Sequence, residues 1–83
     1  MDKDRPLIGI SVGDPAGIGP EITAKALSLP EIYKLSRPLV VGEAEMMKEA
    51  VRFSNLDLKI HSISSSKEGF FQFGTMDILD MKN

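Results

Sequence analysis

The chain has 83 residues, of which 42% are hydrophobic and 27% charged, a composition that suits one small globular domain and excludes a disordered tail. Ten basic and twelve acidic residues give a formal net charge of −2 without any basic cluster, so we expect no nucleic-acid partner. The absence of cysteine excludes disulfides and thiolate chemistry within these residues, and no apolar stretch has the length of a signal peptide or a membrane span. We therefore expect a cytoplasmic protein with no membrane partner.

The first half of the chain predicts a strand, a glycine-rich turn and a helix. Residues 6–12 are apolar and rich in β-branched side chains, which predicts a strand buried on both faces. Residues 20–27 show helical spacing, and Pro20 suits the first position of a helix because its φ is already helical. Pro30 either ends this helix or begins a short second one that runs through Leu35.

The second half of the chain predicts a strand, a helix, a second strand, a loop and a last strand. Residues 38–42 form a second buried-strand candidate, and residues 43–53 have apolar side chains at helical spacing. Apolar and polar residues alternate over 56–61, which predicts a half-exposed strand. Residues 64–69 are serine-rich and predict a loop, and residues 76–79 predict a last short strand.

Strands that alternate with helices predict an α/β fold built from parallel βαβ units. In such a fold residues 6–12 and 38–42 are adjacent parallel strands, joined through the helix at 20–28.

The loop between the first strand and the first helix carries the main functional signal, and its sequence is Gly13-Asp14-Pro15-Ala16-Gly17-Ile18-Gly19-Pro20-Glu21. Ligands of open α/β sheets bind at the carboxyl ends of the strands, where this loop begins. Its three glycines permit positive φ angles and close approach of a ligand to the backbone. The structural alternative is that the glycines only form a tight turn, which Asp14 braces through its own backbone.

Two phosphate-binding motifs do not fit this loop. A Walker loop requires a lysine after the last glycine, but Pro20 follows Gly19, and a Rossmann fingerprint requires a third glycine where Ile22 stands. Pro20 also removes one backbone N–H, and Glu21 adds a negative charge where a pyrophosphate would lie. The loop therefore favours hydroxyls, an amide or a cationic ring such as oxidised nicotinamide.

The loop resembles the N-terminal signature of the 4-hydroxythreonine-4-phosphate dehydrogenase family. It is also similar to the Gly-Asp-Gly-Ile-Gly-Pro-Glu loop of isopropylmalate and isocitrate dehydrogenases, with Pro15-Ala16 as an insertion. The resemblance extends to residues 7–19 as the family's first strand and turn, residues 21–27 as its first helix and residues 37–42 as its second strand. Beyond about residue 54 it is loose.

The resemblance implies that residues 1–83 are a single partial domain, the N-terminal part of an isocitrate/isopropylmalate dehydrogenase-like α/β/α domain in a homodimeric, two-domain enzyme. Such an enzyme oxidises a 4-phosphorylated hydroxy acid with NAD, and a β-keto acid then loses carbon dioxide. The substrate is 4-phosphohydroxy-L-threonine, used in pyridoxal 5′-phosphate biosynthesis, or threonate or erythronate phosphate. Residues 33–42 look slightly more like the second branch.

The resemblance also implies a divalent metal held by histidines from later in the chain, so we expect no catalytic or metal-binding residue here and an inactive 83-residue chain. The expected cofactor-binding residues are Gly13, Asp14, Gly17, Ile18, Gly19 and Glu21. The alternative function is a small non-catalytic α/β module that binds a nucleotide or a protein.

Other residues invite structural explanations. We expect the one histidine, His61, to lie on the solvent-exposed surface. Met46, Met47, Met76 and Met81 are expected in the core. Phe70, Phe71 and Phe73 are expected at a buried strand edge or in contact with a missing domain, and Ser64, Ser65 and Ser66 in a solvated loop.

Overall fold

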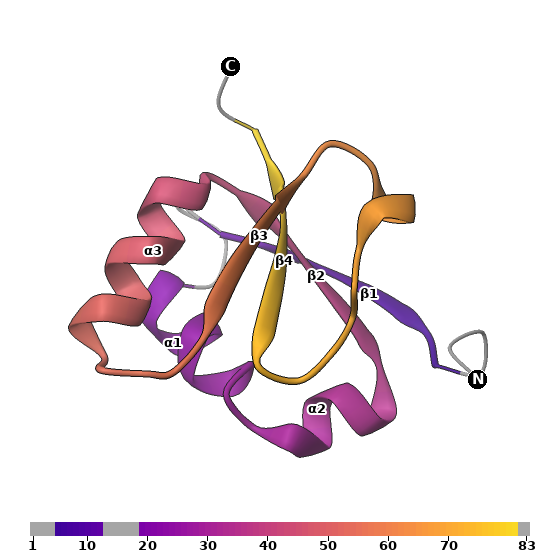
Figure 1. The fold of residues 1–83 in the computed structure, drawn as a ribbon, viewed down its shortest axis with the longest axis horizontal. Helices are drawn as coiled ribbons and strands as arrows, with labels where there is room; N and C mark the ends of the chain where they lie inside the picture. The colour runs from indigo at the N-terminus through magenta and orange to yellow at the C-terminus, as the bar shows by residue number, and fades with distance from the viewer. Residues whose placement is uncertain (1–4, 13–18, 82–83) are drawn as a thin grey trace.

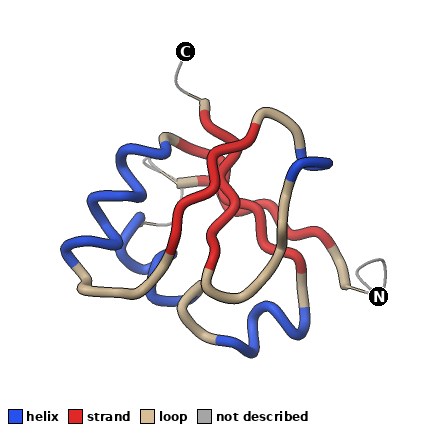
Figure 2. Tube along the Cα trace, in the orientation of Figure 1, coloured by secondary structure: helices blue, strands red, loops and turns tan. Residues whose placement is uncertain are grey.

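A computed structural model describes residues 5–12 and 19–81. These residues form four strands, three α-helices and one 3₁₀ turn, in an order that confirms the predicted alternation (Figures 1 and 2). In chain order the elements are β1 (Leu7–Ser11), α1 (Pro20–Ala26), α2 (Pro30–Leu35), β2 (Arg37–Gly42), α3 (Ala44–Phe53), β3 (Lys59–Ile63), the 3₁₀ turn η2 (Ser66–Glu68) and β4 (Thr75–Asp80).

The four strands form one parallel sheet in the order β1-β2-β4-β3. Gly9 of β1 lies opposite Leu39 of β2, and Val40 of β2 lies opposite Ile78 of β4. The predicted α/β class and the predicted parallel pairing of the first two strands are therefore confirmed.

The helices α1 and α2 begin with the same tripeptide, Pro-Glu-Ile. In each the proline occupies the first turn, where its missing N–H leaves no helical bond unmade, and the glutamate lies at the positive end of the helix dipole. Lys25 and Lys34 lie in the last turns and complement the opposite ends. The short second helix, one of two possibilities in the sequence, is thus formed.

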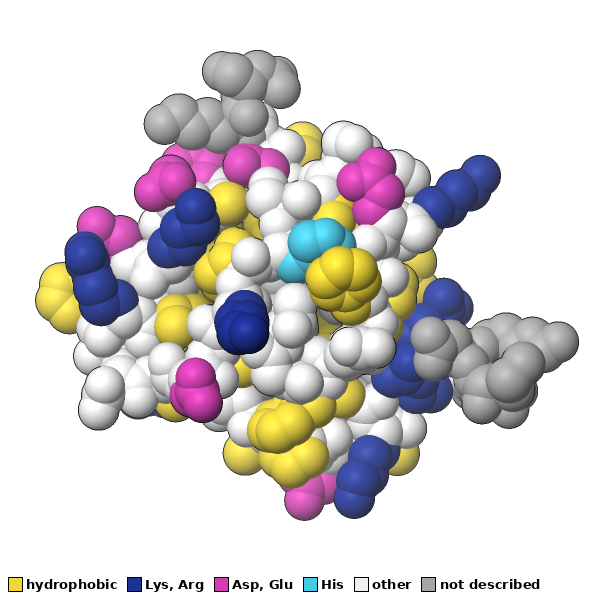
Figure 3. Space-filling view, in the orientation of Figure 1, with side chains coloured by type: hydrophobic (Ala, Val, Ile, Leu, Met, Phe, Trp, Pro, Cys, Tyr) yellow, Lys and Arg dark blue, Asp and Glu magenta, His cyan; other side chains and the backbone are white. Residues whose placement is uncertain are grey.

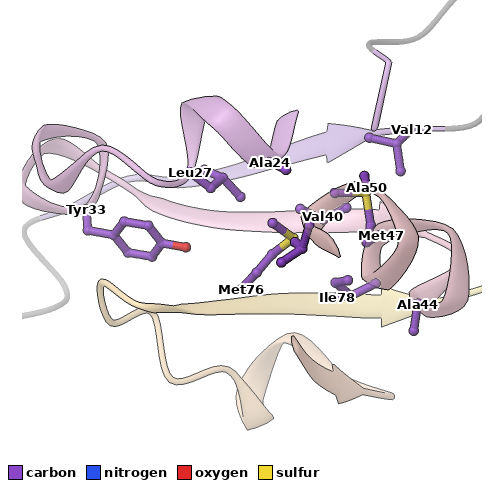
Figure 4. Packing of buried hydrophobic residues seen from close by; sticks show 11 residues of the cluster. Val12, Ala24, Leu27, Tyr33, Val40, Ala44, Met47, Ala50, Met76 and Ile78 are labelled. Atoms are coloured by element: carbon purple, nitrogen blue, oxygen red, sulfur yellow. The ribbon is translucent and has the colours of Figure 1, made fainter. Parts of the chain in front are cut away.

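The main core lies between the helices and one face of the sheet. Figure 4 shows Met76 and Ile78 of β4 and Val40 of β2 meeting side chains of the helices, among them Met47 of α3. All four of these side chains are fully buried, and burial of each contributes about 1.5–3 kcal/mol. The buried members of this cluster are Val12, Ala24, Leu27, Tyr33, Val40, Ala44, Met47, Ala50, Val51, Met76 and Ile78.

The other face of the sheet is covered by an irregular segment rather than a helix. Residues 64–74 connect β3 to β4, and in Figure 4 the part that contains η2 lies on the far side of β4 from the labelled core side chains. A smaller cluster forms beneath this segment, from Leu39, Ile63 and Phe71 with Leu79 partly buried. The three α-helices therefore pack on one face of the sheet, and the segment 64–74 covers the other.

Three expectations about burial and strand bounds are wrong. β1 is mostly exposed, with Leu7 and Ile8 each 44% accessible, because it is the terminal strand of the sheet in the described residues. β3 begins at Lys59 rather than at residue 56, since Leu56 and Leu58 reach the main core from the connection before it. Met81 is 60% exposed and is not part of the core.

No helix within residues 5–12 and 19–81 has both the length and the apolar character that crossing a bilayer requires.

Candidate functional site

A cavity of about 400 Å³ opens at the carboxyl ends of β1 and β2. Ser11 and Val12 form its wall on the β1 side, and Gly42 and Glu43 form it where β2 passes into α3. Val41, Met46 and Met81 complete the lining. This is the edge at which α/β proteins bind ligands, because the loops that follow parallel strands gather there.

A second cavity, of about 370 Å³, lies between the start of α1 and α3. It is lined by Gly19, Pro20, Glu21, Ile22, Met46, Glu49, Ala50 and Phe53. Met46 lines both cavities, so the two hollows adjoin. Residues 13–18, which the structure does not describe, connect Val12 of the first cavity to Gly19 of the second.

Of the predicted cofactor-binding residues, Gly13, Asp14, Gly17 and Ile18 lie outside the described residues. Gly19 and Glu21 line the second cavity together, and both are exposed. Gly19 has φ −67° and ψ 149°, so the positive φ anticipated for the glycines is not needed there. A Cβ atom at Gly19 would meet nothing within 4 Å. Neither the backbone conformation nor the packing of the described residues therefore requires a glycine at this position.

Gly42, which lines the first cavity, is required for packing. A Cβ atom at this position would lie 2.5 Å from Cγ2 of Val12 and 3.2 Å from its carbonyl oxygen. The N–H of Met81 donates to the carbonyl of Gly42 at 2.8 Å, which ties the end of β4 to the same point. Sequence reasoning placed Gly42 in a strand and missed this role.

The electrostatics of this edge disfavour an anion. The positive end of α3 already has a partner, because Oδ1 of Asp80 accepts the N–H of Ala44 at 3.4 Å. Asp80 Oδ2 also accepts the hydroxyl of Ser62 at 3.5 Å. Glu21 and Glu43 are exposed on the cavity walls, and no described lysine or arginine lines either cavity. Such an edge suits a neutral or cationic group better than a phosphate.

A separate polar cluster, which the sequence reasoning missed, surrounds Asp77 in the middle of β4. Asp77 is fully buried and accepts three N–H groups, those of Phe70 at 3.0 Å, Phe71 at 2.7 Å and His61 Nδ1 at 2.8 Å. The signal in the sequence was a lone aspartate inside an apolar strand, because a buried carboxylate requires partners. The cluster fixes the segment 64–74 onto the sheet.

His61 is therefore half-buried and partnered rather than simply exposed. Its ring stacks on that of Phe70, with centroids 3.8 Å apart and an angle of 4° between the planes. Figure 3 shows the histidine at the surface against a hydrophobic side chain. Phe70 and Phe73 are exposed, whereas Phe71 is buried, so the first of the two expectations, burial, holds only for Phe71, and contact of Phe70 and Phe73 with a missing domain stays a prediction.

Phe71 has an unusual backbone conformation, with φ 50°. A bulky residue rarely adopts this region, so its surroundings must impose it. The bond from its N–H to Asp77 is one restraint, and the ring lies against Gly69, where a Cβ atom would be 2.4 Å from Phe71 Cζ. Arg5 donates to the carbonyl of Phe71 at 3.3 Å, and the guanidinium of Arg37 lies 5.7 Å from the ring centre.

Burial, with the nearby carboxylate of Asp77 as a second cause, raises the pKa of Tyr33 to about 12. Both effects disfavour the phenolate, the first through desolvation and the second through charge repulsion. The protonated hydroxyl donates to the carbonyl of Thr75 at 3.0 Å. Tyr33 is thus a structural donor that joins α2 to the start of β4.

The described residues do not fit a metal site, since no three histidine, cysteine, aspartate or glutamate side chains among them gather around one point. Any divalent metal would need ligands from elsewhere.

No family model matches the chain. Among curated proteins it is 45% identical, over all 83 residues, to a Clostridium botulinum protein named "Putative D-threonate 4-phosphate dehydrogenase", and it covers 25% of that protein. A Symbiobacterium thermophilum protein of the same name is 48% identical over 77 residues, which are 93% of this chain and 23% of the relative.

Solved structures of proteins with related names have the same fold as this chain. A 4-hydroxythreonine-4-phosphate dehydrogenase from Burkholderia phymatum superposes with a TM-score of 0.86 at 36% identity, over 93% of this chain and 23% of that one. The enzyme of that name from Klebsiella pneumoniae gives 0.69 at 33% identity, over 92% and 23%. The chain spans about a quarter of the length of the relatives it matches.

Proposed function

We propose, with the confirmed likeness to the 4-hydroxythreonine-4-phosphate dehydrogenase family as the premise, that residues 1–83 are a single partial domain of an NAD-dependent, metal-dependent dehydrogenase. The enzyme oxidises and decarboxylates a 4-phosphorylated four-carbon hydroxy acid. The observation that carries the proposal is the match along the whole chain to proteins named as D-threonate 4-phosphate dehydrogenases, together with a cavity at the carboxyl ends of β1 and β2 and a second one that adjoins it between α1 and α3.

Within that substrate class we favour D-threonate 4-phosphate over 4-phosphohydroxy-L-threonine and erythronate phosphate. The relatives named for D-threonate 4-phosphate are 45% and 48% identical to this chain, whereas the solved structures named for 4-hydroxythreonine-4-phosphate are 36% and 33% identical. The residues that distinguish a hydroxyl from an amine on the substrate are expected outside this chain.

The loop from Gly13 to Glu21 is proposed to hold the nicotinamide end of NAD, which accepts a hydride when the cofactor is bound. The supporting observation is that Glu21 lines one cavity and Glu43 the other, while Asp80 already accepts an N–H at the start of α3, because negative charges favour a cationic ring over a phosphate. Gly19 leaves open space beside its backbone, which permits close approach of a flat ring.

The divalent metal and the substrate phosphate are proposed to bind residues outside this chain. The described residues offer no group of metal ligands, and neither cavity is lined by a described lysine or arginine. We therefore expect the purified 83-residue chain to produce no NADH from NAD and D-threonate 4-phosphate, with or without added divalent metal. Metal-dependent NADH production by this chain would contradict the proposal. We also propose that the longer enzyme is a homodimer and cytoplasmic.

The test of the cofactor site is a set of variants in the longer protein. Gly19→Ala should leave the melting temperature unchanged, since its methyl group meets no atom, yet it should raise KM for NAD. Glu21→Gln should also weaken NAD binding, because it removes one negative charge. Glu31→Gln is the matched control, since Glu31 holds the same place in the second Pro-Glu-Ile tripeptide, on α2.

Asp14→Asn, also made in the longer protein, separates a cofactor contact from a turn brace. We expect it to lower turnover or NAD affinity while the melting temperature stays the same. If NAD affinity and turnover match the unmodified enzyme in Asp14→Asn, Gly19→Ala and Glu21→Gln alike, the loop does not bind the cofactor.

A further inference from the structure

Glu43 stands at the N-cap position of α3, yet its side chain does not cap the helix. Serine, threonine, aspartate and asparagine are favoured at this position, because their short side chains can accept the first free N–H groups of a helix. In this protein Asp80 at the end of β4 takes over that task, since its Oδ1 atom accepts the N–H of Ala44 at 3.4 Å. Within residues 5–12 and 19–81 the Glu43 carboxylate makes no hydrogen bond and no ion pair. The fold of this part of the chain therefore has no structural use for its charge.

The neighbouring acidic residues of α3 differ from Glu43 in this respect. Glu45 pairs with Lys48 at 3.3 Å, and Glu49 pairs with Arg52 at 3.2 Å, so basic side chains of the same helix balance both charges. Glu43 instead lines the first cavity, at the carboxyl ends of β1 and β2, and no described lysine or arginine lines that cavity. A carboxylate without a counter-charge at a ligand-binding edge favours a bound cation.

We propose that Glu43 is the residue by which this site distinguishes the oxidised from the reduced cofactor. This inference rests on the proposed function and adds a specificity residue to it. The nicotinamide ring of NAD carries a positive charge. Transfer of a hydride from the substrate carbon neutralises the ring, while the proton of the substrate hydroxyl passes to a base outside this chain. The attraction between Glu43 and the ring therefore exists before the reaction and is lost after it, which favours binding of NAD and release of NADH.

Two other carboxylates lie near this edge, but both have structural tasks. Asp80 caps α3 and accepts the hydroxyl of Ser62 at 3.5 Å, so its substitution would disturb contacts among β3, β4 and α3. Glu21 lies in the first turn of α1, where it stabilises the positive end of the helix. Glu43 can lose its charge without losing a bond to the described residues, so a change in cofactor affinity on its substitution reports the charge itself.

The test compares the dissociation constants of NAD and NADH for the longer protein that contains residues 1–83, measured by isothermal titration calorimetry without substrate. Glu43→Gln should raise the dissociation constant of NAD about three- to tenfold and leave that of NADH within about twofold. Glu45→Gln is the matched control, because it makes the same change two residues further along α3, at a charge that Lys48 balances and that lines neither cavity. It should change neither constant.

The ratio of the two constants separates a charge effect from a structural one. If Glu43 only supported the start of α3, Glu43→Gln would lower the melting temperature and weaken NAD and NADH by the same factor, which would overturn the inference. Unchanged constants for both forms would overturn it as well. Glu43→Asp keeps the charge on a side chain one methylene shorter, so it should retain a larger part of the preference for NAD than Glu43→Gln does.

The production of NADH from D-threonate 4-phosphate, measured on the same proteins, separates this inference from the proposed function. A preference for NAD that depends on Glu43, in a protein that produces no NADH, would support the role of Glu43 and refute the proposed reaction. NADH production with the same ratio of constants in Glu43→Gln and the unmodified protein would support the reaction and overturn the role of Glu43. A longer protein that binds neither form of the cofactor would overturn both.

Discussion

Replacing Asp77 by alanine is expected to lower the free energy of unfolding by about 3 kcal/mol. The side chain is fully buried in β4, and its two oxygens accept the N–H groups of Phe70, Phe71 and His61 at 2.7–3.0 Å. The substitution therefore tests whether this buried carboxylate fixes the covering of the sheet's second face.

The expected loss of stability depends on whether each N–H donor can reach water once its acceptor is removed. Phe71 is 7% exposed, so its N–H loses its partner without gaining water, at a cost of about 2 kcal/mol. Phe70 and His61 are nearer the solvent, and each lost bond there costs about 1 kcal/mol. Removing a charge from the interior offsets about 1 kcal/mol of this total, which leaves about 3 kcal/mol.

The assay is urea denaturation of the 83-residue chain, followed by circular dichroism. Asp77→Asn keeps one acceptor oxygen in nearly the same place, so its loss should be smaller, about 1–2 kcal/mol. The exposed Asp57 provides the control, because Asp57→Ala should change stability by less than about 0.5 kcal/mol. Exchange of the Phe71 amide should accelerate in Asp77→Ala. A loss below about 1 kcal/mol, with the Phe71 amide still protected, would refute the reasoning.

Two further predictions follow from buried groups. Tyr33 is the only tyrosine and there is no tryptophan, so ultraviolet absorbance should report its ionisation at about pH 12, and earlier in Asp77→Asn. Because the unfolded chain releases this proton near pH 10, the stability that Tyr33 contributes should be constant below pH 10 and fall as the pH rises to about 12. Ionisation of Tyr33 in the folded protein at pH 10 would contradict this. Gly42→Ala should destabilise by about 1–3 kcal/mol through its contact with Val12, and the additional substitution Val12→Ala should recover part of the loss. Equal melting temperatures for Gly42→Ala and the unmodified chain would exclude that contact.

The sequence predicted the elements well because their signals are local. Pro20 and Pro30 mark the two helix starts, and the apolar runs at 38–42 and 76–79 become strands in which Val40 and Ile78 are fully buried. Alternation alone could not fix the start of β3, because the residues just before it reach the core from an irregular connection. Strand composition likewise predicted a buried β1, but exposure depends on which strands lie beside it.

The site was harder to predict, because its features depend on distant pairs. The contact of Gly42 with Val12 joins residues thirty positions apart, and the bond of Asp80 to Ala44 joins residues 36 positions apart. His61 and Asp77 meet only because β3 and β4 are neighbours in register. The glycine-rich loop was identified by its motif, yet only Gly19 and Glu21 of its predicted contacts lie in the described part of the chain.

The strand order has a consequence for how the chain folds during synthesis. Of the four described strands β4 is the last to leave the ribosome, but it lies between β2 and β3, which do not pair with each other in the described sheet. Until Thr75–Asp80 are available, β3 therefore has no ladder partner, and the core lacks Met76 and Ile78. β1 and β2 can pair earlier, through α1 and α2. A nascent chain that stops short of residue 75 would hold a two-stranded ribbon with α3 packed against an incomplete sheet, a form that invites capture by chaperones.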